Sequence, residues 1–165
     1  MKKLTSMEDL YVHELRDLYS AENQLIKALP KMAKAVSSDD LKEALETHLE
    51  ETMEQAKRLE TICRKLGINP KGQKCKAMEG LLEEGKESME LEVDDPQIRD
   101  AAIIAAAQRV EHYEIAGYGC ARTFAELLGE DEAAELLQTT LDEEAGADKK
   151  LTEVAQSINM EAMAE

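Results

Sequence analysis

Aromatic residues, proline and glycine are scarce in this chain. Its 165 residues include no tryptophan, one phenylalanine, three prolines and eight glycines. Because aromatic side chains are enriched in strands, their scarcity argues against an all-β core. Alanine, leucine, glutamate, lysine and methionine are abundant instead, and all five have high helix propensity. The composition therefore favours a helical protein.

Long apolar runs are also missing. The longest lies around Ala101–Ala107, far short of the roughly 20 residues that a membrane-spanning helix needs. Residues 1–6 lead quickly into acidic sequence and contain no signal-peptide core. We therefore expect no membrane contact and a cytoplasmic location, where Cys63, Cys75 and Cys120 stay free thiols.

Positive charge is in deficit. The chain has 36 acidic and 20 basic residues, which give a formal net charge of −16. Such a surface repels nucleic-acid phosphates and anionic lipid, so neither is an expected partner. The chain also lacks a P-loop, a Gly-x-Ser-x-Gly motif and a Cys/His pair at a recognisable spacing. These absences argue against kinase and serine or cysteine hydrolase chemistry.

A helical repeat of apolar residues is the dominant positive signal. In four long segments the apolar positions recur at alternating steps of three and four, which draws one stripe along a helix. These segments are 11–36, 41–66, 103–128 and 134–158. A short turn joins the first two and another joins the last two, so each pair forms antiparallel neighbours. The stretch between the pairs has room for a short helix near Ala77–Leu91.

This connectivity predicts an all-α fold, a ferritin-like antiparallel four-helix bundle with a long crossover that carries an extra short helix. We expect one domain over residues 1–165, divided into a helical hairpin at 6–66, a crossover at 67–96, a second hairpin at 97–158 and a short tail at 159–165. Residues 37–40 and 95–96 have the sequence of helix N-termini. Pro30 is expected to kink the first helix or end its regular part.

Polar residues interrupt every stripe near the middle of its helix. Glu22, Glu51, Glu114 and Glu144 each lie fourteen or fifteen residues from the turn of their hairpin. At ~1.5 Å per residue, all four are about 22 Å from their turns. Equal distance from the turn means equal height in an antiparallel hairpin. The four helices therefore bring carboxylates to one level of the bundle.

Buried carboxylates at one level repel each other and are costly without partners. Either they are protonated and share hydrogen bonds, or cations hold them. Two divalent cations need about four carboxylates for neutrality, together with one or two neutral imidazoles. The four glutamates and His48 supply that set, so the sequence predicts two metal ions per chain. For His48, a core histidine bonded to a facing glutamate is the alternative.

Several positions near this level leave alternatives open. On the fourth helix the stripe favours Glu144, whereas a weak repeat at an offset of 92 residues favours Glu143. Tyr118 follows Glu114 by one turn and can donate a hydrogen bond to it or relay protons. His112 points away from Glu114, so we expect it to contact another helix or subunit.

Five segments carry a resemblance to a known family, which extends from about Met7 to Ala155. Residues 18–22, 48–52, 75–81, 110–119 and 141–144 resemble, in order, the YciE/YciF family of bacterial ferritin-like proteins, and more distantly the rubrerythrins. The resemblance implies a ferritin-like bundle with a dinuclear site, usually of iron, a homodimer and a role in bacterial stress responses. It also implies that Glu111 and Glu114 form the paired Glu-x-x-Glu of the third helix, with both carboxylates serving the metals.

The chain departs from the usual di-iron pattern at the histidines. Ferritin-like sites carry Glu-x-x-His on two helices, but the residue three after Glu51 is Glu54, and Gly146 and Ala147 follow Glu143 and Glu144. His48, three residues before Glu51, is the candidate substitute. The resulting donor set is rich in oxygen, so manganese, magnesium or calcium is possible beside iron.

The sequence thus predicts a di-metal carboxylate stress protein that reacts with or sequesters iron, O₂ or peroxide. It leaves open whether the chain is an enzyme of the di-iron oxidase or peroxidase type. The alternatives are a non-catalytic metal-binding protein and a purely structural dimeric bundle.

Overall fold

All of the regular secondary structure in the described residues is helical. A computed structural model describes residues 3–164, within which there are five helices and no strand. The helices are α1 Met7–Ala35, α2 Asp39–Lys65, α3 Lys76–Met89, α4 Pro96–Leu127 and α5 Asp131–Ala162. The ends of the expected domain, residues 1, 2 and 165, lie outside the described residues. The predicted all-α class is confirmed.

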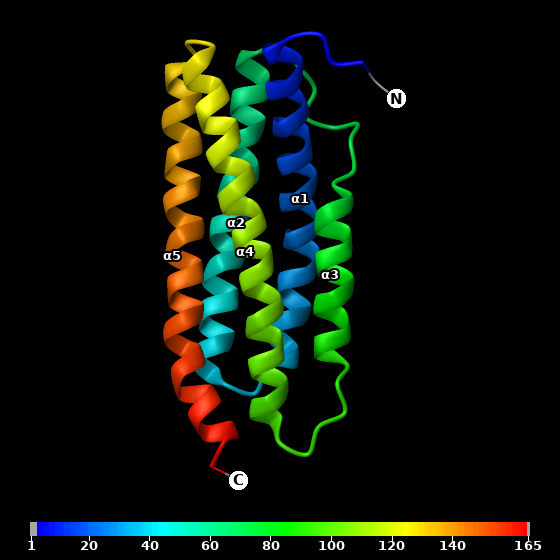
Figure 1. Cartoon of the computed structure of the whole chain (residues 1–165), viewed down its shortest axis with the longest axis vertical. Helices are drawn as coiled ribbons and strands as arrows, with labels where there is room; N and C mark the ends of the chain where they lie inside the picture. Colours follow the sequence, from blue (N-terminus) through cyan, green and yellow to red (C-terminus); the bar gives the residue numbers. More distant parts are fainter. Residues whose placement is uncertain (1–2, 165) are drawn as a thin grey trace.

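Four long helices form the bundle and the fifth lies beside it (Figure 1). α1 packs mainly on α2 and α4 packs mainly on α5, as two antiparallel hairpins. Contacts of α1 with α4 and of α2 with α5 close the four-helix arrangement. The short α3, which belongs to the crossover, lies against α4 and α1. This is the ferritin-like bundle expected from the sequence.

The helix ends follow the local chemistry of the chain. The Ser38 side chain accepts a hydrogen bond from the backbone of Leu41, and Asp95 caps α4 just before Pro96. Both N-terminal signals are therefore confirmed. After α2 and α4 the chain turns through Gly67 and Gly129, whose φ angles of 66° and 73° suit glycine.

The lengths of two helices differ from expectation. Pro30 does not end α1, which continues to Ala35, and a kink at this residue stays a prediction. α5 runs to Ala162, so most of the tail expected from residue 159 is helical. No proline or glycine follows residue 158 to stop that helix. No helix of the described chain is long and apolar enough to cross a membrane.

A buried aspartate ties the first turn to the second hairpin. Asp100, near the start of α4, is only 1% exposed. Its carboxylate accepts hydrogen bonds from the backbone nitrogens of Ser37 at 3.0 Å and Ser38 at 2.8 Å. The link fixes the turn between α1 and α2 against α4, and it sets the relative height of the two hairpins.

The apolar core is divided into two halves. One buried apolar cluster includes Leu25, Leu45 and Ile103, and the other includes Leu15, Leu59 and Leu137. Buried polar residues lie between the two clusters along each long helix: Glu22, His48, Thr52, Gln55, Glu111, Glu114, Thr140 and Glu144. The core therefore contains a polar layer, defined by these eight residues, at the height where the sequence predicted carboxylates.

Candidate metal centre

Four glutamates and one histidine form the acidic part of the polar layer. Glu22, Glu114 and Glu144 are 0% exposed, Glu111 is 3% exposed and His48 is 5% exposed. They come from α1, α4, α5, α4 and α2 in that order, so each bundle helix contributes. Glu111 and Glu114 are one turn apart on α4 and both face the bundle interior, as residues spaced by three do.

Four of these side chains converge on one small volume. One potential ligand atom from each of His48, Glu111, Glu114 and Glu144 lies within 4.8 Å of every other. His48 Nε2 is 3.2 Å from Glu111 Oε1 and 4.0 Å from Glu144 Oε2. A buried imidazole with three carboxylates at this spacing can hold a metal ion.

The polar atoms of the group lack hydrogen-bond donors. Both carboxylate oxygens of Glu114 and of Glu144 are buried without a hydrogen-bond partner, as are Glu22 Oε2 and Glu111 Oε2. Neither ring nitrogen of His48 makes a hydrogen bond either. Buried carboxylates are normally satisfied by several donors. Divalent cations bind where several carboxylate oxygens without hydrogen-bond partners lie close together. These residues therefore fit a metal centre.

The pKa shifts of the buried glutamates also favour a bound proton or cation. Burial raises the pKa of Glu22, Glu111 and Glu114 well above the usual carboxyl range, and the neighbouring carboxylates raise each pKa further. Glu144 approaches both Glu111 and Glu114, so a proton on one carboxyl can be shared with the next. Without a cation, the group therefore retains protons. With a cation, the positive charge replaces those protons.

Glu51 lies at the edge of the group. Its side chain is 37% exposed, and its Oε2 is 3.5 Å from His48 Nδ1. The structure therefore places it beside the imidazole, on the solvent side of the layer, and not inside the cluster of four potential ligands. Metal ligation by Glu51 stays a prediction.

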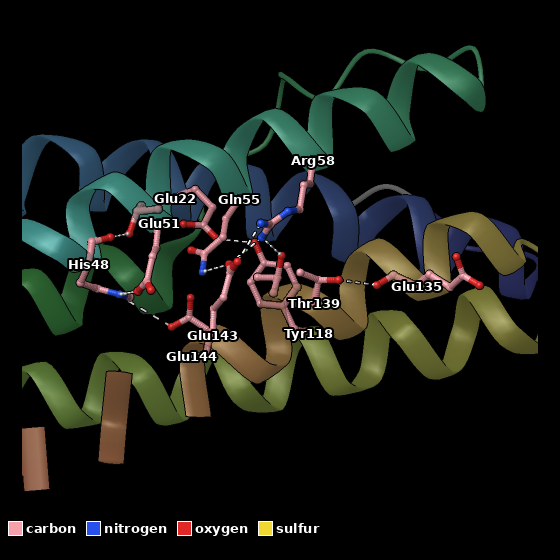
Figure 2. A network of polar contacts seen from close by, with 12 residues as sticks. Glu22, His48, Glu51, Gln55, Arg58, Tyr118, Glu135, Thr139, Glu143 and Glu144 are labelled. Atoms are coloured by element: carbon pink, nitrogen blue, oxygen red, sulfur yellow. Dashed lines mark hydrogen bonds and ion pairs between the residues drawn. The ribbon is translucent and has the colours of Figure 1, made fainter. Parts of the chain in front are cut away.

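The structure separates the two candidates on α5. Glu144 points into the buried group, whereas Glu143 turns toward Arg58 of α2, as Figure 2 shows. Arg58 Nη1 and Nη2 donate to the two Glu143 oxygens at 2.5 and 2.7 Å, and Gln55 donates to Glu143 at 3.1 Å. The apolar stripe thus indicated the inward residue, and the internal repeat did not.

Arg58 is the residue that sequence reasoning missed. No Lys or Arg occupies an apolar stripe at the height of the carboxylates. Arg58 precedes the stripe residue Leu59, and its long side chain reaches across to α5. It also donates to the Thr140 hydroxyl at 3.1 Å. The guanidinium closes one side of the polar layer.

Tyr118 has a different partner from the one expected. Its hydroxyl donates to Glu22 Oε1 and not to Glu114, one turn away on the same helix. Tyr118 is fully buried, and burial raises the pKa of its phenol. His112 behaves as expected, since its Nε2 lies 3.3 Å from Asp148 of α5 and its side chain is 68% exposed.

A cavity of about 260 Å³ opens beside the group, between α2 and α5. Its inner end is lined by the buried residues His48 and Glu111, and the more exposed Glu51 also lines it. Leu45 and Leu151 form apolar wall on either side. The cavity gives small molecules a route from solvent to the buried carboxylates.

The comparisons with known proteins agree with this architecture. The family described as "Domain of unknown function (DUF892)" matches residues 6–164. Protein YciF of Escherichia coli (strain K12) is 47% identical over 161 residues, which is 96% of each chain. The crystal structure of the E. coli stress protein YciF matches with a TM-score of 0.90 and 47% identity, over 94% of this chain and 98% of that chain.

Two further solved structures are similar. YcfI from Rhodopseudomonas palustris has a TM-score of 0.87 and 47% identity, over 92% of this chain and 96% of that chain. A protein from Xanthomonas campestris pv. campestris has a TM-score of 0.77 at 20% identity, over 96% and 97% of the two chains. At that identity the likeness shows the fold alone.

Proposed function

This chain belongs to the DUF892 family, and we propose that it binds two divalent metal ions, iron first and manganese second, in its polar layer. The resemblance to the YciE/YciF family that five sequence segments carry is confirmed. A single observation carries the proposal: six buried carboxylate oxygens have no hydrogen-bond donor, namely one each from Glu22 and Glu111 and both from Glu114 and Glu144. Only a proton or a cation can compensate them there.

Charge balance supports a pair of ions. The four buried carboxylates carry four negative charges when ionised, which two divalent cations neutralise. Glu111, Glu114, Glu144 and His48 would hold metal at the point where their ligand atoms converge. Glu22 would face them from α1, and Glu51 would complete the set from the solvent side. One imidazole among several carboxylates is an oxygen-rich set, which admits manganese as well as iron.

Bound iron would supply one-electron chemistry with O₂ or peroxide. The chain's own residues would position and protect it. The Tyr118 hydroxyl donates a hydrogen bond to Glu22 Oε1 and so orients this carboxyl group. Arg58 fixes Glu143 outside the metal group and so keeps a second α5 carboxylate away from it. The cavity beside His48 admits small molecules from solvent.

The setting we propose is a cytoplasmic homodimer that acts in a stress response. The support for the last point is the description of the E. coli relative as a stress protein. The proposed function has two alternative forms. One is turnover of O₂ or peroxide at the metal pair, and the other is stoichiometric metal uptake without turnover. The missing Glu-x-x-His pair favours the second form, and the cavity favours the first.

The first test is metal content after purification without chelators, followed by an anaerobic Fe(II) titration. We expect saturation near two ions per chain and a higher melting temperature with metal. A ligand that binds only the folded state at 100 times its Kd adds about 2.7 kcal/mol of stability. The Glu22→Ala/Glu114→Ala variant should lose both effects, and Glu46→Ala, at an exposed α2 position, should keep both.

Turnover is measured next, as O₂ and peroxide consumption by the iron-loaded protein. Repeated turnover supports an oxidase or peroxidase. A single stoichiometric reaction supports sequestration. No saturable metal uptake and no thermal shift would leave a purely structural bundle and overturn the proposal.

A further inference from the structure

The cavity between α2 and α5 lies where an expected ligand is missing. Ferritin-like sites place a histidine three residues after the glutamate of the fourth helix, on the same helical face. Here that residue is Ala147, which follows Glu144 and lines the cavity. The short side chain leaves open the space that an imidazole would fill.

Buried polar side chains line the inner end of this space. His48 and Glu111 line the inner end of the cavity and are each more than nine-tenths buried. Both ring nitrogens of His48 and Oε2 of Glu111 lack a hydrogen-bond partner. Such atoms can accept a hydrogen bond from a ligand or, for the histidine, give one. The inner end of the cavity is therefore ready for a polar molecule that both donates and accepts.

The cavity has room for a molecule larger than O₂ or peroxide. Its volume of about 260 Å³ is several times the roughly 30 Å³ that one water occupies in the liquid. Ala44, Leu45 and Leu151 supply apolar wall. A small organic molecule with an apolar body fits such a space better than a cluster of waters.

Charge selects among small organic molecules. Besides Glu111, whose raised pKa favours the neutral form in the metal-free chain, the cavity is lined by the carboxylates of Glu43 and Glu51 and by one ammonium group, from Lys150. The small excess of negative charge disfavours anions. A neutral molecule with a hydrogen-bond donor and a nitrogen acceptor on a small apolar ring meets all three requirements of shape, polarity and charge.

We propose that this cavity binds a small neutral nitrogen heteroaromatic molecule, an azole, in the place of the missing histidine. The ring lies between Leu45 and Leu151, and its N–H donates to Glu111. The proposal goes beyond the metal function, because the walls of the cavity belong to the chain with or without metal. In the metal-bound protein a ring at this position would offer a nitrogen donor to an oxygen-rich set.

The probe is imidazole, titrated into the chelator-treated, ¹⁵N-labelled chain at pH 8, where the ring is mainly neutral. We expect saturable amide shifts confined to α2 residues 43–51, α4 near Glu111 and α5 residues 146–151. Ala147→Leu should weaken binding at least tenfold by filling the cavity. Ala145→Leu, the same change at an exposed position on the same helix, should leave the affinity unchanged.

A second variant, a control ligand and a metal titration complete the experiment. Ala44→Leu fills the cavity from α2 and replaces Ala147→Leu if that variant does not fold. Propionate, an anion of similar size, should not bind. Absence of saturable imidazole shifts, or equal binding by propionate, overturns the proposal. A separate Zn(II) titration of the same protein distinguishes a failed metal centre from a failed azole site, since imidazole binding to the metal-free chain does not depend on it.

Discussion

At the scale of single residues, Glu114 shows most clearly that a carboxylate in the polar layer needs a bound proton or cation. It is fully buried, and neither of its carboxylate oxygens has a hydrogen-bond donor. Glu22, Glu144 and Glu111 all raise its pKa, after burial itself. A residue in this environment is either protonated or bound to a cation, so its ionisation is coupled to the stability of the whole chain.

The stability of the metal-free protein should therefore fall as the pH rises. The folded-state pKa of Glu22, Glu111 and Glu114 is raised above the ordinary value of 4.5. A raised folded pKa gives stability that is fully present below about pH 4.5 and is lost as the pH rises through the folded pKa. We expect urea midpoints of the chelator-treated chain to decrease from mildly acidic toward neutral pH. A midpoint that rises over this interval would contradict the prediction.

Glu114→Gln isolates this effect in one side chain. The amide cannot ionise, so the metal-free variant should have a shallower pH dependence and should gain about 1–3 kcal/mol of stability at neutral pH. The same variant should gain less stability from metal than the parent chain. Urea unfolding with and without Fe(II) measures both, with the exposed Glu46→Gln as control. A less stable metal-free Glu114→Gln protein would mean that the carboxylate is already compensated.

The residues of the centre differ in how far the sequence could predict their placement. Glu22, Glu114 and Glu144 sit on apolar stripes, so helical periodicity was enough to direct them inward. Glu111 was suggested by family resemblance. Arg58 was missed because its Cα lies off the stripe, and only the length of its side chain brings it to Glu143.

At the scale of elements, the polar layer joins helices as well as holding charges. Arg58 of α2 and Glu143 of α5 form a two-pronged ion pair in which both side chains are about three-quarters buried. It links the two hairpins at a height where the layer offers few apolar contacts. Lys65 and Glu132 also pair between α2 and α5, but both are well exposed.

These two pairs should contribute very differently to stability. Hydrogen bonds to charged groups that are shielded from water contribute about 1.5–3 kcal/mol, so Arg58→Ala should cost roughly that amount. Lys65→Ala should change stability little, because exposed pairs are weak and screened. Denaturant unfolding of both variants checks the contrast. Equal effects would show that the buried pair has no special role between the hairpins.

The helix boundaries were predictable wherever the chain contains a cap or a breaker. Asp95 and Pro96 marked the start of α4, and the glycines Gly67 and Gly129 follow the ends of α2 and α4. The end of α5 at Ala162 was not predicted, because the apolar stripe ends at Ile158 while the good helix formers continue. The cavity also escaped prediction, since its volume depends on how α2 and α5 pack against each other.

Two glycines provide a test of these boundaries. Gly80 lies inside α3, and an added Cβ would meet no atom within 4 Å. Gly80→Ala should therefore stabilise the protein by about 0.5–1 kcal/mol. Gly67 has a φ of 66° after α2, so Gly67→Ala should destabilise by about 1–2 kcal/mol. Thermal unfolding of the two variants should shift in opposite directions, and a shift in the same direction would refute the assignment.

At the scale of the whole molecule, net charge is the dominant property. A formal charge of −16 on 165 residues produces self-repulsion that favours the unfolded chain. The charge is also expected to attract cations toward the chain, which assists metal uptake at low ionic strength. The predicted homodimer stays a prediction, and sedimentation velocity measures it directly.

Salt should consequently stabilise the metal-free protein. Screening shortens the range of the repulsion from about 30 Å at 0.01 M to about 8 Å at 0.15 M ionic strength. We expect the melting temperature to rise steadily over this range when the salt is one that does not bind the protein. A melting temperature that falls with salt would mean that attractive ion pairs outweigh the repulsion.

The division of the core into two apolar halves has a consequence for cooperativity. Leu25 and its neighbours lie on one side of the polar layer, and Leu15 and its neighbours lie on the other. In the metal-free chain the layer offers little cohesion between them, so amide hydrogen exchange should report two opening units with separate free energies. Ions held by side chains from all the bundle helices would couple these units, and exchange should then become a single global event. The proposed metal pair would then make the two apolar clusters unfold cooperatively, as one unit.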